Sequence, residues 1–279
     1  MLTISVAVVS EVRNHDERDV ARVTAALQRQ AIRDFRRIWR VEATVDSFPV
    51  LEDVPVGYWP ILIREDIGTP GAAGIHLDKD GQPFALVSMS DSWSLTASHE
   101  LLEMLADPFG NRLVPGQSPK PDQGRVEFLV EVCDPSEADQ FGYTVNDILM
   151  SDFYTPHFFD PVKAEGVRYS FTGAITEPRT ILEGGYISWH DPVSDHWWQE
   201  IWFGPQPEFR DLGVFDAAKT GMSLRSWIDG QTDHPGIDKG LPKDNRTLTA
   251  AVAAGEQTAA SSNAKAAAWR EQISAILKG

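Results

Sequence analysis

The chain of 279 residues is predicted to adopt a mixed α+β fold. Its first residues are rich in Val and Ile, as in a buried strand, and the apolar residues that follow recur at helical spacing. Several short apolar runs, separated by turn signals, then lead to a second apolar helix. The apolar content of 42% is sufficient for one large domain or two modest ones, each with its own core.

The N-terminal part is expected to form a mixed sheet covered by helices. Residues 3–9 are predicted to form a buried strand, and the apolar positions from Val20 to Phe35 lie on one face of a helix. The turn residues Asp80 and Gly81 are typical of a hairpin. Further strands are predicted from the alternating or apolar runs at 41–45, 59–63, 74–77 and 84–89.

The middle of the chain is predicted to be less regular. Residues 109–125 are rich in Gly, Pro and polar residues and are expected to form a loop. The apolar run at 126–133 fits a strand or a short helix. The dense aromatic residues at 184–203 favour a β-rich core or a packed loop over a platform for a ligand.

Three units follow from these patterns. Residues 1–135 would form the sheet with its helices, residues 136–240 an irregular, aromatic-rich unit on the substrate side, and residues 241–279 an Ala-rich helical tail. Within the tail, Gly255 and a polar interruption at 261–263 predict a helical hairpin or a partly mobile segment.

The composition argues against several classes of partner. A net charge of −16 would repel a phosphate backbone, so no nucleic-acid partner is expected. No stretch has the ~20 apolar residues of a membrane helix. The short apolar run at 2–9 is not preceded by a basic residue, as it would be in a signal peptide. Cys133 is the single cysteine, so the sequence offers no internal disulfide. These observations predict a soluble, cytoplasmic protein without a membrane partner, although export that needs no signal peptide stays open.

The early arginines are the local exception to the acidic composition. Acidic residues are interleaved with them, which favours an ordinary ion-paired helix surface over an anion-binding one. The arginines are Arg13, Arg18, Arg22, Arg29, Arg33, Arg36, Arg37 and Arg40.

The segment Ser98-His-Glu-Leu-Leu-Glu103 is the strongest chemical signal. Positions 99 and 103 are about 40° apart around a helix axis, so His99 and Glu103 can share one ion. Glu100, about 100° further round, would lean toward the open side and could take a proton from a water molecule that the metal activates. Because the surrounding helix is apolar on most of its circumference, it should be buried, and buried acids need partners.

The His99-Glu100 pair resembles the active-site helix of the zincin-type metallopeptidase family, whose pattern is His-Glu-x-x-His. The order of predicted strands and helices up to this point is also similar. The departure is Glu103, which stands where the family has a second histidine. Glutamate is an acceptable zinc ligand, but a site richer in carboxylate would be less selective for Zn over Mn or Fe.

The resemblance also implies a third ligand further along the chain. The metzincin spacing would place it at Phe109, so that pattern fails. Gluzincins take a Glu from a segment some twenty or more residues downstream, and Glu131 is chosen over Glu127 because it stands with Asp134 at the end of an apolar run.

Other residues near the motif remain candidates for the same site. Asp107 lies about 80° from His99 around the helix and competes as a ligand, and either Asp107 or Asp134 could instead orient the imidazole. Cys133 is expected to be a small buried hydrophobe before it is a ligand. Tyr154 and His157 could stabilise a developing oxyanion, although a histidine in this apolar setting is more often structural.

The resemblance therefore implies a metal-dependent hydrolase, a peptidase or amidase acting on a peptide or protein substrate. Two alternatives remain. One is a non-catalytic binding or structural module that keeps the fold and a metal. The other is a metal-independent glycoside hydrolase with paired carboxylates, either Glu127 with Glu131 or Glu100 with Glu103, which would leave His99 without a role.

Overall fold

The computed structural model describes residues 3–13, 16–69, 71–232 and 254–277. It confirms a mixed α+β fold, in which one sheet carries α-helices and a second sheet is antiparallel throughout. Among these residues, no helix is both long and apolar enough to cross a membrane.

The first sheet has five strands in the order β2-β1-β3-β5-β4. Neighbours are parallel except β4, which runs antiparallel to β5 and lies at one edge. The predicted strands are all present, and Asp80 and Gly81 turn between the last two with positive φ angles of 55° and 79°. The strands are β1 (Ile4–Ser10), β2 (Ala43–Phe48), β3 (Trp59–Arg64), β4 (Gly74–Lys79) and β5 (Gln82–Ser88).

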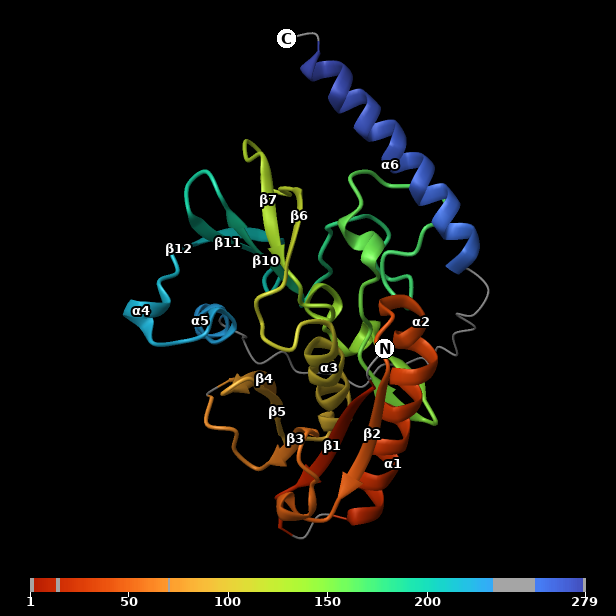
Figure 1. Ribbon diagram of the computed structural model, residues 1–279, viewed down its shortest axis with the longest axis vertical. Helices are drawn as coiled ribbons and strands as arrows, with labels where there is room; N and C mark the ends of the chain where they lie inside the picture. Colours follow the sequence, from red (N-terminus) through yellow and green to blue (C-terminus); the bar gives the residue numbers. More distant parts are fainter. Residues whose placement is uncertain (1–2, 14–15, 70, 233–253, 278–279) are drawn as a thin grey trace.

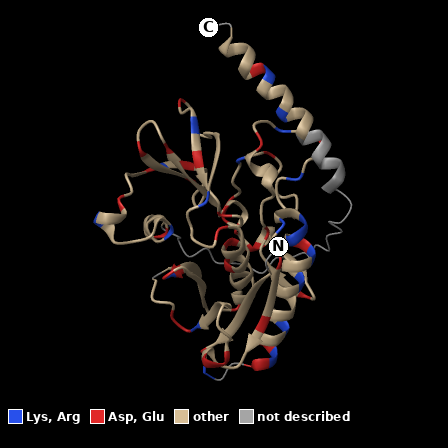
Figure 2. Ribbon diagram, viewed as in Figure 1, with Lys and Arg blue, Asp and Glu red and all other residues tan. Residues whose placement is uncertain are grey.

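Two helices pack beside each other on this sheet (Figure 1). Helix α1 (Glu17–Arg29) lies against β2, and α3 (Trp93–Ala106) lies against β4 and β5. Basic and acidic residues alternate on the surface of α1, as the interleaved sequence predicts (Figure 2). Helix α1 continues through a π-helical turn, Gln30–Phe35, into the short α2 (Arg36–Trp39).

The π-helical turn brings a polar side chain into the core. Gln30 is fully buried; its Nε2 donates to Tyr143 Oη and to the Ser151 carbonyl, and its Oε1 accepts from Ser98 Oγ on α3 at 2.8 Å. Ser98 Oγ in turn accepts from the Ser151 N–H at 3.0 Å. These bonds fix the position of α3 one residue before His99.

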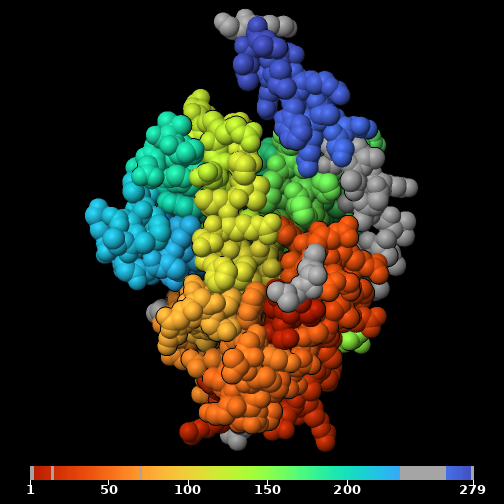
Figure 3. Space-filling view, viewed as in Figure 1, coloured from red at the N-terminus to blue at the C-terminus, as the bar shows by residue number. Residues whose placement is uncertain are grey.

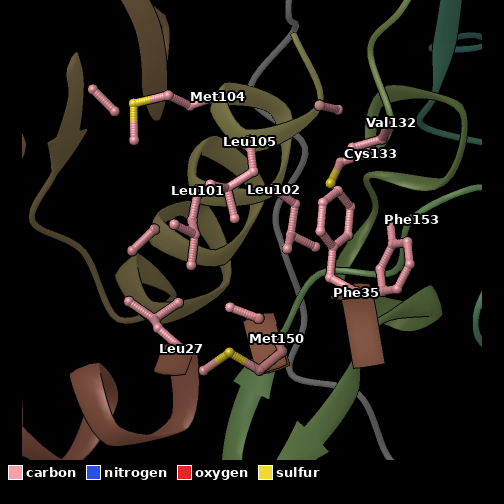
Figure 4. Close-up of a cluster of buried hydrophobic side chains, with 14 of the residues drawn as sticks. Leu27, Phe35, Leu101, Leu102, Met104, Leu105, Val132, Cys133, Met150 and Phe153 are labelled. Atoms are coloured by element: carbon pink, nitrogen blue, oxygen red, sulfur yellow. The ribbon is translucent and has the colours of Figure 1, made fainter. Parts of the chain in front are cut away.

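One hydrophobic core connects the first sheet to the following half of the chain. Figure 4 shows leucines of α1 and α3 packed near side chains from residues 132–153, a segment that lies between two strands of the second sheet in the sequence. These buried residues include Leu27, Phe35, Leu101, Leu102, Leu105, Val132, Cys133, Met150 and Phe153.

The second sheet has the order β12-β11-β10-β7-β6 and is antiparallel. The prediction of a loop at 109–125 was wrong for residues 113–117, which pair with β7 and form a strand. The aromatic segment forms the hairpin β10–β11, with Trp189 fully buried. The strands are β6 (Leu113–Gln117), β7 (Arg125–Leu129), β10 (Tyr186–Asp191), β11 (His196–Ile201) and β12 (Glu208–Gly213).

The predicted boundary at residue 135 does not separate the two sheets, since β6 and β7 precede it and β7 pairs with β10, which follows it. Along the chain, the segment between β7 and β10 forms a small hairpin and several short 3-10 turns. The hairpin pairs β8 (Tyr143–Val145) with β9 (Ile148–Met150). The short helices α4 (Ala217–Thr220) and α5 (Leu224–Gln231) follow β12.

The predicted tail is partly described. Residues 241–253 and 278–279 lie outside the described residues, and Ala254–Ile276 forms a single helix, α6, which contains Gly255 and the polar stretch at 261–263. The described part of the tail is therefore one continuous helix, without a hairpin turn at either interruption. Figure 3 shows α6 projecting from one end of the molecule, and Lys265, in the middle of the helix, pairs with Asp160.

Candidate metal centre

Helix α3 is buried along almost its whole circumference, as its composition predicts. Thirteen of its fourteen residues are buried, including His99, Glu100 and Glu103. The helix begins after Ser92 and ends before Asp107, where Pro108 follows. Its position between the first sheet and the segment after β7 brings acids from distant parts of the chain to the same place.

Three side chains converge on the C-terminal half of α3. His99 Nε2 lies 3.4 Å from Glu103 Oε1 and 3.0 Å from Asp134 Oδ1. Asp134 comes from a 3-10 turn, Asp134–Ser136, that follows β7, and both Asp134 and Glu103 are fully buried. Ligand atoms about 2.0–2.2 Å from a tetrahedral ion lie about 3.3–3.6 Å apart, so these atoms could hold one metal ion.

A second group shares one of these residues. His76, on β4, places its Nδ1 at 3.6 Å from Glu100 Oε2 and 3.5 Å from Glu103 Oε2. All three side chains are buried, and the group could also hold a metal ion. Glu103 therefore presents one oxygen to His99 and the other to His76.

Arg225 on α5 closes another side of the cluster. Its guanidinium makes a close ion pair with Glu131 and lies 2.9 Å from Asp229. It also approaches Glu103 Oε2 at 3.4 Å and Asp134 Oδ2 at 3.6 Å. The side chain of Arg225 is only 7% exposed, so this is a buried network of charges.

The cluster holds more negative than positive charge. The cluster contains five carboxylates and one guanidinium, so it would carry four uncompensated negative charges with all the carboxylates ionised and both histidines neutral. Burial raises the pKa values of Glu103 and Asp229, and raises that of Glu131 well above its ordinary value despite the arginine. The carboxylates are Glu100, Glu103, Glu131, Asp134 and Asp229.

Asp134 and His99 respond differently to the same surroundings. Burial alone would raise the pKa of Asp134, but Arg225 and His99 lower it below its ordinary value. Burial alone would lower the pKa of His99, but the carboxylates of Glu103 and Asp134 and the Cys133 thiol together raise it well above its ordinary value. Without a metal, the imidazolium of His99 thus serves as a partial counterion.

Glu131, the first choice for a third ligand, lies against Arg225 and outside both groups of potential ligand atoms. Asp134, three residues later, takes the place beside His99. Asp107 also lies outside the groups: its Oδ2 accepts from the Arg112 backbone N–H at 2.7 Å and so supports the turn after α3. Cys133 is fully buried, and its backbone N–H donates to Glu103 Oε1 at 3.2 Å.

The two residues proposed as oxyanion donors are in different settings. Tyr154 is buried, its hydroxyl has no hydrogen-bond partner among the described residues, and burial together with Glu131 and Glu103 raises its pKa well above the ordinary value. His157 is further out, with Nδ1 at 3.1 Å from Asp160 Oδ2. The structure therefore brings Tyr154, and not His157, into the electrostatic neighbourhood of the carboxylates.

Sequence reasoning missed His76 and Arg225. His76 is in the predicted apolar run 74–77, where the alternating pattern indicated a strand but gave no reason to assign chemistry to one of its residues. Arg225 is on a short helix far along the chain. Arg225 stands between Leu224 and Ser226, and its sequence neighbours gave no sign of a buried charge.

The fold and the site define a mixed α+β protein whose buried histidine and carboxylate groups could hold a metal ion. No protein-family model, curated protein or solved structure matches the chain.

Proposed function

We propose that the protein is a metal-dependent hydrolase, a peptidase or amidase, in which His99, Glu103 and Asp134 hold the catalytic ion. The observation that carries the proposal is the convergence of three buried ligand atoms, from α3 and from the turn Asp134–Ser136, at separations of 3.0 and 3.4 Å. Asp134 Oδ2 lies 3.6 Å from Arg225 and has no hydrogen-bond donor among the described residues, so it keeps lone pairs for a metal.

The donor set fits a divalent cation. One imidazole and two carboxylates can bind Zn, and they also suit Mn or Fe(II). The uncompensated negative charge of the cluster favours any cation that enters. When bound, such an ion polarises a carbonyl group and increases the acidity of a coordinated water molecule.

Glu100 is proposed as the general base. It follows His99 directly on α3, is 4% exposed, and its Oε2 has no hydrogen-bond partner among the described residues. A carboxylate in this position can accept a proton from the attacking water and hold it for the leaving amine. Tyr154 is the proposed donor to the developing oxyanion, because its raised pKa keeps the hydroxyl protonated at neutral pH.

The edge strand β4 supports a peptide as the substrate. Among the described residues it is the last strand of its sheet, and α3 packs against its face, where Gly74 lies beside Glu100. An unpaired strand edge can bind an extended peptide through main-chain hydrogen bonds. A peptide bound in that way would lie beside the strand that carries His76 and Gly74.

A non-catalytic metal or ion-pair centre is the second candidate. Arg225 and the complete burial of Glu103 and Asp134 favour it, since structural metal sites are closed whereas catalytic sites keep an open position. The distinction is whether the ion, once bound, supports turnover.

The test measures metal content and peptide hydrolysis together. Glu100→Gln is expected to keep the ion held by His99 and to lose turnover of a peptide mixture followed by mass spectrometry. Wild type treated with a chelator should lose turnover as well. Glu127→Gln is the matched control and should leave both unchanged, since Glu127 contacts His190 outside the cluster. Hydrolysis by Glu100→Gln at the wild-type rate would refute the base assignment.

His99→Ala should lose both the ion and the activity. A wild type that binds metal but hydrolyses no member of the mixture would favour the non-catalytic centre. Hydrolysis of glycosides that persists in chelator and falls in Glu127→Gln would favour the paired-carboxylate mechanism instead.

A further inference from the structure

His76 is a buried histidine without a conventional partner. It lies on β4, with Nδ1 near Glu100 and Glu103 of α3, and is 2% exposed. Neither ring nitrogen has a hydrogen-bond partner among the described residues. A buried polar atom that is left unsatisfied costs about 1–3 kcal/mol, so two such atoms on one ring indicate a ligand that the protein atoms do not supply.

The oxygens nearest to His76 are also unsatisfied. Glu100 Oε2 and Glu103 Oε2 lie 3.6 and 3.5 Å from its Nδ1, and neither has a hydrogen-bond partner among the described residues. These separations are too long for hydrogen bonds and equal those between ligand atoms around a shared ion.

The backbone of β4 approaches α3 closely enough to hold this group together. A Cβ atom at Gly74 would lie 2.5 Å from Glu100 Oε1 and 2.6 Å from Thr96 Cγ2, so only glycine fits at that position. The absence of a side chain lets Glu100 lie against the strand, two residues from His76.

We propose that His76, Glu100 and Glu103 form a second divalent-cation site, and that Glu103 bridges it to the site at His99 and Asp134. Glu103 Oε1 faces His99 while Oε2 faces His76, which is the arrangement that a bridging carboxylate requires. With all five carboxylates ionised and both histidines neutral, one divalent cation would leave two of the four excess negative charges, and two cations would neutralise all four. Asp229 adds to the negative potential felt by this site.

Arg225 limits the site and does not fill it. Its Nη2 is 3.4 Å from Glu103 Oε2, the oxygen that also faces His76. A carboxylate oxygen has two lone pairs, so it can accept from the guanidinium and still coordinate an ion. Arg225 makes its closest contacts with Glu131 and Asp229, which leaves Glu100 and His76 without a cation.

The second ion should affect turnover, and this consequence alone rests on the proposed function. Glu100 cannot be a metal ligand and the free general base at once. Turnover is therefore expected to be highest when one ion is bound and to fall as the second site fills.

The test counts ions in the full-length protein. Wild type loaded with Mn²⁺ and freed of excess should contain two ions per chain by elemental analysis, with an electron paramagnetic resonance spectrum of two coupled ions. His76→Ala should contain one, uncoupled. His157→Ala is the matched control, since His157 pairs with Asp160 away from the cluster, and should retain two coupled ions.

Several results would overturn the second site. One ion per chain in wild type does so whatever the variants show, as do two coupled ions in His76→Ala. If His76→Ala fails to fold by circular dichroism, His76→Phe, which fills the space without offering a ligand, replaces it in the comparison. Two ions at saturation, with no turnover at any ratio of metal to protein, would refute the proposed function and leave the second site standing. Turnover with a single ion per chain even at saturating metal would refute the second site alone.

Discussion

Replacing Glu103 with glutamine should have opposite effects on stability with and without metal. In the metal-free protein the ionised Glu103 is unfavourable, because burial and the neighbouring Asp134 raise its pKa above the ordinary value. The amide of Gln keeps the volume, can still accept from the Cys133 N–H, and carries no charge. Metal-free Glu103→Gln should therefore be at least as stable as metal-free wild type near pH 7.

Added metal should reverse that order. An ion at a thousand times its dissociation constant stabilises the folded state by about 4 kcal/mol, which raises the melting temperature of a protein of this size by on the order of 10 °C. Glu103 is a ligand in both proposed sites, so Glu103→Gln should show little of this increase.

Thermal unfolding of both proteins, in chelator and across a Zn²⁺ or Mn²⁺ titration, checks the expectation. Two results together would refute the reasoning. One is a loss of about 3–5 kcal/mol by Glu103→Gln in chelator, which is the cost of removing one partner of a buried ion pair. The other is a wild type that metal does not stabilise. That outcome would mean that Arg225 and the histidines already balance the carboxylates.

Three further changes test the surroundings of the site. Ser98→Ala leaves the Gln30 side-chain oxygen and the Ser151 backbone N–H without a hydrogen bond. It should lower the free energy of unfolding, measured in urea, by about 2–4 kcal/mol. The control Ser94→Ala loses one hydrogen bond and should cost about 1 kcal/mol. Gly74→Ala should cost about 1–3 kcal/mol and weaken binding of the second ion, whereas Gly204→Ala, with open space around it, should do neither. Burial raises the pKa of Glu200 to about 7, so the folded state binds its proton more tightly than the unfolded state. The free energy of unfolding should therefore fall by up to about 3 kcal/mol between pH 4.5 and 7.5. Glu200→Gln should remove that fall, whereas Glu183→Gln, at an exposed position, should not.

The sequence was most informative where local pattern and burial coincide. Alternation predicted the strands of the first sheet, and the apolar surroundings of His99 and Glu103 predicted a buried helix with both side chains on one face. It was least informative where pairing between distant segments decides the outcome. Residues 113–117 have a loop-like composition, and they form β6 because β7 offers hydrogen-bond partners.

The same limit applies to the site. Glu131 and Asp134 are close in sequence, and nothing local distinguishes the acid that meets His99 from the acid that meets Arg225. His76 faces α3 because β4 is the antiparallel edge strand, which depends on the order of all five strands. The second group of ligand atoms could therefore be recognised only from the three-dimensional arrangement.

The π-helical turn at Gln30–Phe35 makes the position of the proposed metal-binding cluster depend on the number of residues in a helix that contributes no ligand to it. A π-helical turn contains one residue more than the α-helical turn it replaces, so deleting a single residue there would restore a regular helix. Every side chain on one side of the deletion would then rotate by about 100° relative to the other. Gln30 could no longer meet Ser98 while Phe35 stayed in the core, so a one-residue deletion in this turn is expected to be far more harmful than one in an exposed loop.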